Sequence, residues 1–147
     1  MTVAETTPSG QTESISFEFD LRHSPKKVWR ALTEPALLAE WLLPVLDLQL
    51  DFAKGAEFRL QAPPKPGWDG AVNCKFVEIE AQKKLSYTWV VGEIDTVVTF
   101  TLTPTDSGTR LSLLQTGFKP NQKQNFGGAR YGWRMFSAKL VEVLEKL

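Results

Sequence analysis

Few residues of this chain could carry out a chemical step, and their spacing does not indicate a catalytic set. His23 is the only histidine, and no serine, cysteine or carboxylate stands at a spacing typical of a triad. Glu57 and Asp69 fall near the mouth of any cavity that the strands enclose, but nothing pairs them as a general acid and base. Cys74 falls at an inward-facing position of a predicted strand and has no basic neighbour on that face. This predicts that it is a small buried hydrophobic residue with an ordinary thiol. No catalytic residue is predicted.

The same inventory of residues argues against a metal site or a bound cofactor. One cysteine and one histidine cannot supply the ligands of a structural zinc site, and a lone cysteine cannot form an internal disulfide. We therefore expect no metal and no cofactor. A single free cysteine also fits a reducing, cytoplasmic setting.

Three polar residues could orient a ligand: Gln115, Tyr87 and Arg130. Gln115 continues the inward parity of Leu111 and Leu113, so its amide is expected to be buried. A buried amide must be hydrogen-bonded, so Gln115 is either satisfied by backbone at the end of its strand or available to a ligand. The first reading is the more common one for such a residue.

Aromatic side chains with inward parity form the second part of a candidate binding site. Aromatic residues at such positions usually belong to the core, but a strongly bent sheet closed by one helix leaves space that side chains do not fill. Trp41 and Trp68 either line an entrance or cap the core. The predicted ligand-binding residues are Trp41, Phe76, Tyr87, Trp89, Phe100, Gln115, Phe126, Arg130 and Tyr131.

The element that must position these residues is one long amphipathic helix at residues 121–147. Its apolar residues recur in steps of three and four, and the stripe is too wide and aromatic for a two-helix seam. They are Phe126, Ala129, Trp133, Phe136, Leu140, Val143 and Leu147. We place Trp133 in the core, and Phe126 and Tyr131 at a cavity. Gly127-Gly128 either brings the backbone close to a ligand or belongs to a loop, with the helix beginning only at Ala129.

The rest of the chain alternates with period two, which predicts a sheet for the long helix to pack on. A strand at 15–22 precedes two short helices, which begin at Ser24-Pro25 and Glu34-Pro35 and end before Pro44. Strands are then expected at 46–52, 56–61, 72–79, 85–91, 94–103 and 109–116. A change of phase at Val77 indicates a bulge. The predicted fold is α+β, with a curved antiparallel sheet of about six to seven strands wrapped around the last helix.

Composition places the chain among globular proteins. Its 147 residues suit one domain, which we assign to residues 14–147, after a flexible tail at residues 1–13. Seventeen basic and seventeen acidic residues cancel, which argues against binding to nucleic acid. The longest apolar run, Trp41–Leu46, is too short to span a membrane, so no membrane insertion is expected.

Six short pieces of the chain stand in the order of a known family. They are Ser24-Pro25 through Val28-Trp29-Arg30-Ala31-Leu32-Thr33, Glu40-Trp41 with Pro44, Gly55-Ala56-Glu57-Phe58, Leu85-Ser86-Tyr87-Thr88-Trp89, Gly108-Thr109-Arg110-Leu111, and Gly132-Trp133. With these pieces the chain resembles the START-like, helix-grip (SRPBCC) superfamily, and within it the group related to the C-terminal domain of the Hsp90 ATPase activator Aha1. Ala56 stands where the family commonly has a second glycine. Ala81-Gln82 stands where the family has a proline. Both departures concern turns.

The resemblance implies the helix-grip fold and leaves three functions open. The first is binding of a small hydrophobic molecule, such as an aromatic, lipid or polyketide-like one, between the sheet and the last helix. The second is contact with an Hsp90-type chaperone or another protein, which would use exposed residues such as Arg59, Lys65 and Trp68. The third is a cyclase, dehydratase or hydrolase, with Tyr87, Gln115 and Arg130 as orienting or proton-handling groups. The inward aromatic set favours the first.

Overall fold

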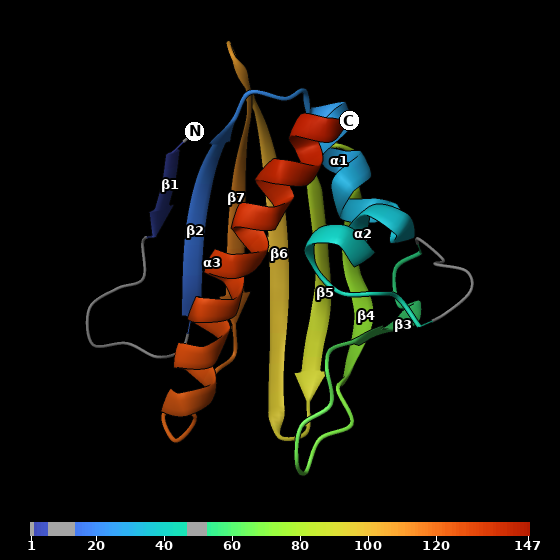
Figure 1. The fold of residues 1–147 in the computed structure, drawn as a ribbon, viewed down its shortest axis with the longest axis vertical. Helices are drawn as coiled ribbons and strands as arrows, with labels where there is room; N and C mark the ends of the chain where they lie inside the picture. Colours follow the sequence, from blue (N-terminus) through green and yellow to red (C-terminus); the bar gives the residue numbers. More distant parts are fainter. Residues whose placement is uncertain (1, 6–13, 47–52) are drawn as a thin grey trace.

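The structure, a computed structural model, describes residues 2–5, 14–46 and 53–147. It contains one antiparallel sheet and three helices (Figure 1). In chain order the strands are β1 (Thr2–Glu5), β2 (Ser14–Leu21), β3 (Glu57–Gln61), β4 (Ala71–Glu80), β5 (Lys84–Val91), β6 (Ile94–Thr105) and β7 (Gly108–Thr116). The helices are α1 (Pro25–Thr33), α2 (Pro35–Trp41) and α3 (Lys123–Lys146). The strand order across the sheet is β1-β2-β7-β6-β5-β4-β3.

The two short helices begin and end where local sequence chemistry predicts. Ser24 caps α1, because its hydroxyl accepts a hydrogen bond from the backbone N–H of Lys27 at 3.2 Å, and Pro25 occupies the first turn. Pro35 begins α2 directly afterwards. The indole N–H of Trp41 at the end of α2 donates to the backbone carbonyl of Ala31 at 2.7 Å. This hydrogen bond ties α2 to α1.

The sheet has one buried face and one face toward solvent, as the period-two alternation predicts. Val91 pairs with Ile94 in a two-residue hairpin, and Thr105 pairs with Gly108 in another. The register between β4 and β5 is irregular between Phe76 and Glu78, so the bulge predicted from the change of phase is confirmed.

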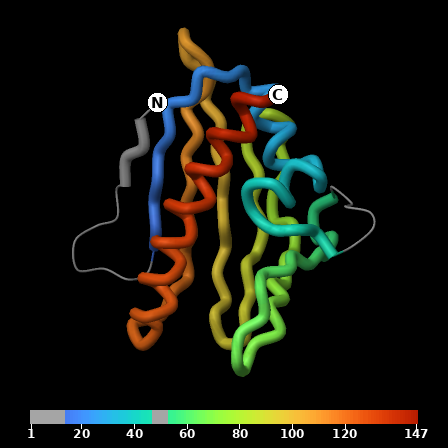
Figure 2. Tube along the Cα trace, viewed as in Figure 1, coloured from blue at the N-terminus to red at the C-terminus, as the bar shows by residue number. Residues whose placement is uncertain are grey.

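Helix α3 lies across the buried face of the sheet, with α1 and α2 beside its C-terminal part (Figures 1 and 2). Trp133, Leu140, Val143 and Leu144 are buried, so the predicted apolar stripe is the face that packs on the sheet. The α+β helix-grip fold is therefore present. No helix of the described part is both long and apolar enough to span a bilayer.

Three details differ from the sequence prediction or resolve it. Thr2–Glu5, which we expected in a flexible tail, forms β1 and pairs with β2, because the outer edge of β2 offers unpaired backbone groups. The strand predicted at 46–52 falls mostly outside the described residues, although Val45 does form a bridge with Leu60. Gly127 and Gly128 lie inside α3, so the helix does not begin at Ala129.

The core between α1, α2 and strands β3–β5 is filled with aromatic rings. The Phe58 and Phe76 rings stack with centroids 4.6 Å apart, and Tyr87 meets both edge-on, at 5.2 and 6.0 Å. Phe100 lies 6.1 Å from Tyr87 and 6.3 Å from Trp41, measured between ring centroids. A void of only about 10 Å³ remains beside these rings, the scale of one water molecule. This end of the core has no room for a ligand.

Candidate functional site

A cleft of about 710 Å³ lies at the other end of the molecule, beside α3. Three walls enclose it: α3, the ends of strands β4–β7, and the connections that flank β3. Along α3 it extends from Gln124 to Lys139, which at 1.5 Å per residue is roughly 22 Å. The volume falls in the range of small-molecule sites, and the length suits an elongated ligand.

The walls of the cleft are mainly apolar. The sheet contributes side chains from four strands, namely Val72, Trp89, Val91, Ile94 and Gln115. The opposite connections contribute Leu42, Leu43, Pro63 and Trp68. Three of the five tryptophans of the chain, Trp68, Trp89 and Trp133, therefore border one space. Flat, rigid aromatic walls favour an apolar or aromatic guest.

The proline-rich loop at 62–70 forms a braced wall. The backbone groups of Lys65 and Trp68 exchange two hydrogen bonds of 2.9 Å, and the indole N–H of Trp68 donates to the carbonyl of Ala71 at 3.0 Å. The side-chain amide of Gln61 donates to the carbonyl of Asp69 at 2.8 Å. Gly70 adopts a φ of +88°, and a Cβ there would lie 2.1 Å from the carbonyl oxygen of Ala62, so only glycine fits. The loop thus holds Trp68 in place at the cleft.

Three side-chain hydrogen bonds link Trp133, Gln115 and Trp89 of the cleft wall through Thr96. The indole Nε1 of Trp133 donates to Gln115 Oε1 at 2.7 Å, and Gln115 Nε2 donates to Thr96 Oγ1 at 2.9 Å. Thr96 Oγ1 in turn donates to the carbonyl of Trp89 at 2.8 Å. Gln115 is 2% exposed and Thr96 is 1% exposed. The amide of Gln115 is satisfied, but by side chains on α3 and β6 and not by the backbone we expected.

Trp133 belongs both to the core and to the cleft. It is 3% exposed, and its ring lies 5.6 Å from Trp89, 6.1 Å from Phe100 and 5.6 Å from Phe136. These contacts agree with the predicted core position. One edge of the residue also borders the cleft, which we had not predicted.

Small residues on α3 leave the space that the cleft occupies. Gly128, Ala129 and Gly132 line it, and a Cβ built on Gly128 would meet no atom within 4 Å. At Gly132 the nearest atom would be Phe136 Cε2, at an ordinary contact distance of 3.8 Å. The helix backbone is therefore exposed to the cleft at these two positions, where larger side chains would fill it.

The structure brings together only part of the predicted set of binding residues. Trp89 and Gln115 line the cleft, whereas Trp41, Phe76, Tyr87 and Phe100 pack in the filled aromatic core. Burial raises the pKa of Tyr87 well above its usual value, and the neighbouring Cys74 raises it further. Burial likewise raises the pKa of the Cys74 thiol to about 12, so this thiol is an inert core group at neutral pH.

Three further predicted residues lie outside the cleft. Tyr131 is 66% exposed and does not line the cleft. Phe126 is buried, but its ring packs on Phe118 with centroids 5.5 Å apart at the start of the helix. Arg130 is half-buried and does not line the cleft. The predicted cavity positions of Phe126 and Tyr131 are therefore not found.

Sequence reasoning pointed to Gly127-Gly128 but did not place Gly132 and Phe136 at the cleft. Gly128, Gly132 and Phe136 recur at steps of four on one face of α3, which is a readable helical spacing. Lys65 and Lys139, on the loop and on α3, are the charged residues of the wall. Nothing in the sequence indicates that these two lysines border the same space.

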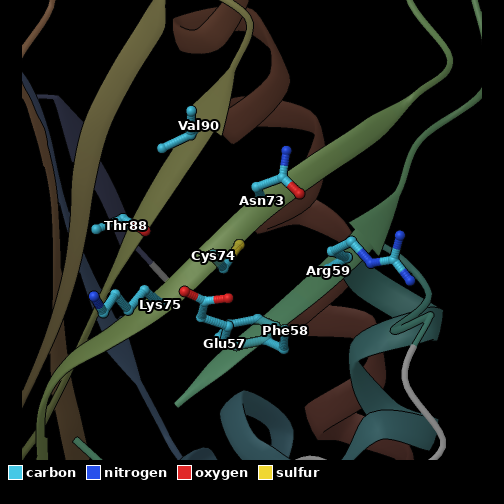
Figure 3. Close-up of a pocket in the computed structure, with 8 residues that line it drawn as sticks. All are labelled: Glu57, Phe58, Arg59, Asn73, Cys74, Lys75, Thr88 and Val90. Atoms are coloured by element: carbon cyan, nitrogen blue, oxygen red, sulfur yellow. The ribbon is translucent and has the colours of Figure 1, made fainter. Parts of the chain in front are cut away.

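A second groove of about 560 Å³ lies on the outer face of the sheet, along β3, β4 and β5 (Figure 3). Its outward side chains are Glu57, Arg59, Asn73, Lys75, Thr88 and Val90. Glu57 and Lys75 are direct cross-strand partners of opposite charge. Because the charges are mixed and the groove is open, it is a weaker candidate for a ligand site than the cleft.

Comparisons with known proteins agree with this architecture. The family described as Activator of Hsp90 ATPase homolog 1-like protein matches residues 22–145. The solved structure of protein MLL2253 from Mesorhizobium loti is 39% identical, covers 90% of this chain and 97% of its own, and has a TM-score of 0.82. Protein NE0264 from Nitrosomonas europaea is 27% identical, with coverages of 95% and 99% and a TM-score of 0.76.

A more distant likeness shows the fold alone. CalU16 from Micromonospora echinospora is 22% identical, with coverages of 97% of this chain and 83% of its own and a TM-score of 0.73. A search of the curated proteins found no match.

Proposed function

The chain belongs to the family of Activator of Hsp90 ATPase homolog 1-like proteins, and from this premise we propose that it binds a small, elongated apolar molecule in the cleft beside α3. The observation that carries the proposal is the cleft itself: about 710 Å³ bordered by Trp68, Trp89 and Trp133. A protein that only needed a packed core would fill this space, as the aromatic cluster at the opposite end does.

The site is preorganised for such a guest. The hydrogen bonds from Trp133 to Gln115 and from Gln115 to Thr96 fix the indole, and the braced loop fixes Trp68. Rigid walls lose little conformational entropy when a ligand binds. This favours affinity even without charged contacts. Gly128 and Gly132 of α3 supply the room along the helix.

The test uses a neutral apolar dye and a variant that fills the cleft. N-phenyl-1-naphthylamine should bind saturably, with energy transfer from the tryptophans that border the cleft. In Gly128→Leu the new side chain would occupy the cleft, so the affinity should fall at least about tenfold. Leucine is also a better helix former than glycine, so the fold is expected to persist.

Gly127→Leu is the matched control. Gly127 is the preceding residue of the same helix and has open space around it, but it does not line the cleft. It should leave dye binding unchanged. An equal loss of affinity in both variants, or no saturable binding to the unmodified chain, would contradict the proposed site.

Contact with an Hsp90-type chaperone is the alternative that family membership suggests. It is supported by the family's description, whereas the cleft supports ligand binding. An Hsp90 ATPase assay at saturating amounts of this protein, run with and without the Gly128→Leu change, separates a chaperone role from a cleft-dependent one.

A further inference from the structure

The charged residues that line the cleft are of one sign in the part of the chain that the structure describes. Twenty of the described residues line it, and they include Lys65 and Lys139 but no aspartate or glutamate. The chain as a whole has seventeen basic and seventeen acidic residues, so this wall departs from the balance of the molecule. The cleft therefore has two cationic groups on an otherwise apolar and amide-bearing surface.

The two lysines stand on different walls. Lys65 belongs to the braced loop at 62–70, and Lys139 belongs to α3 at the end of the cleft furthest from Gln124. The ion pairs found within the described residues are Arg30–Glu34, Lys84–Glu78 and Arg110–Asp20, none of which involves either lysine. Both ammonium groups are exposed, so they can meet a group at the rim while their stems follow the apolar wall.

We propose that the ligand is an amphipathic anion: an elongated apolar body between the tryptophans, with an acidic group that meets Lys65 or Lys139 at the rim. This inference rests on the proposed function, because it specifies the ligand of the same cleft. An apolar body alone would leave the two ammonium groups unused, and a cation would be repelled by them. Carboxylates, sulfonates and phosphates share the chemistry that the lysines would recognise.

A pair of dyes with the same aromatic body tests the charge directly. 1-Anilinonaphthalene-8-sulfonate carries a sulfonate, and N-phenyl-1-naphthylamine does not. The anionic dye should bind more tightly, and added salt should weaken its binding but not that of the neutral dye. Decanoate, decyl phosphate and decanol are then used as competitors against the dyes. Decanol shows whether the cleft accepts an alkyl chain without an acid, and the two anions show which acidic group it accepts.

Lysine variants locate the effect at the rim. Lys65→Gln or Lys139→Gln, whichever removes the lysine that meets the sulfonate, should weaken binding of the anionic dye by about threefold, the size of a solvent-exposed ion pair, and leave binding of the neutral dye unchanged. Lys146→Gln is the matched control, because Lys146 lies on the same helix but not at the cleft.

The two proposals fail in different ways. If both dyes bind with equal affinity and neither lysine variant changes it, the anionic ligand is overturned while the cleft remains a binding site. If all three lysine variants weaken the anionic dye equally, the effect is general charge and the rim assignment is overturned. If neither dye binds saturably, the proposed function fails, and the anionic ligand fails with it.

Discussion

Gln115 is the residue on which the geometry of the cleft depends most. Its amide oxygen accepts a hydrogen bond from the indole N–H of Trp133, and its amide nitrogen donates one to Thr96. One side chain on β7 is therefore bonded to both α3 and β6. Its inward parity was readable in the sequence, but its partners were not. Thr96 and Trp133 lie 19 and 18 residues away along the chain, and only the folded sheet and helix bring them into hydrogen-bond reach.

Gln115→Leu should lower the free energy of unfolding by about 1 to 3 kcal/mol, because it leaves the Trp133 indole and the Thr96 hydroxyl buried without this partner. Urea denaturation measures the loss. In a Trp133→Phe background the same change should be less damaging, since no indole N–H is then left unpaired. Strict additivity of the two changes would show that the hydrogen bond adds nothing to stability.

At the scale of elements, the sequence predicted the long helix, the two short helices and most of the strands, because amphipathic period and capping residues are local signals. Strand β1 was not predicted, since Thr2–Glu5 pairs through backbone groups that carry no sequence signature. The glycines of α3 were ambiguous for a physical reason. Two glycines weaken a helix, and only packing along the rest of α3 decides that it extends back to Lys123.

Gly127→Ala should raise the free energy of unfolding by about 1 kcal/mol, because the position is helical and the added Cβ meets no atom within 4 Å. Gly128→Ala should give the same gain, and thermal melts followed by circular dichroism measure both. Gly70→Ala is the opposing control: its φ is +88° and its Cβ would collide with Ala62, so it should destabilise the protein. Unchanged melting temperatures in both α3 variants would indicate that α3 frays before Ala129.

At the scale of the whole molecule, the helix divides the interior into two parts with different packing. Next to α1 and α2 the rings of Phe58, Phe76, Tyr87 and Phe100 fill the space. Next to the braced loop the space remains open as the cleft. The alternation along the strands predicted that all of these rings face inward. It could not predict which part of the interior they fill, because that depends on how α2 and the loop at 62–70 approach the sheet. Trp133 stands at the boundary between the two parts.

This position makes Trp133 the residue whose loss should affect the whole fold most. Trp133→Ala removes three ring contacts and the hydrogen bond to Gln115, and should cost about 3 to 5 kcal/mol, a large share of a typical stability of about 5 to 15 kcal/mol. Phe126→Ala should cost only about 2 kcal/mol, because Phe126 has one ring partner, Phe118, and lies in the first turn of α3. Paired urea melts compare the two variants. Equal losses, or the larger loss at Phe126, would show that the start of α3 and not its crossing with the sheet anchors the helix.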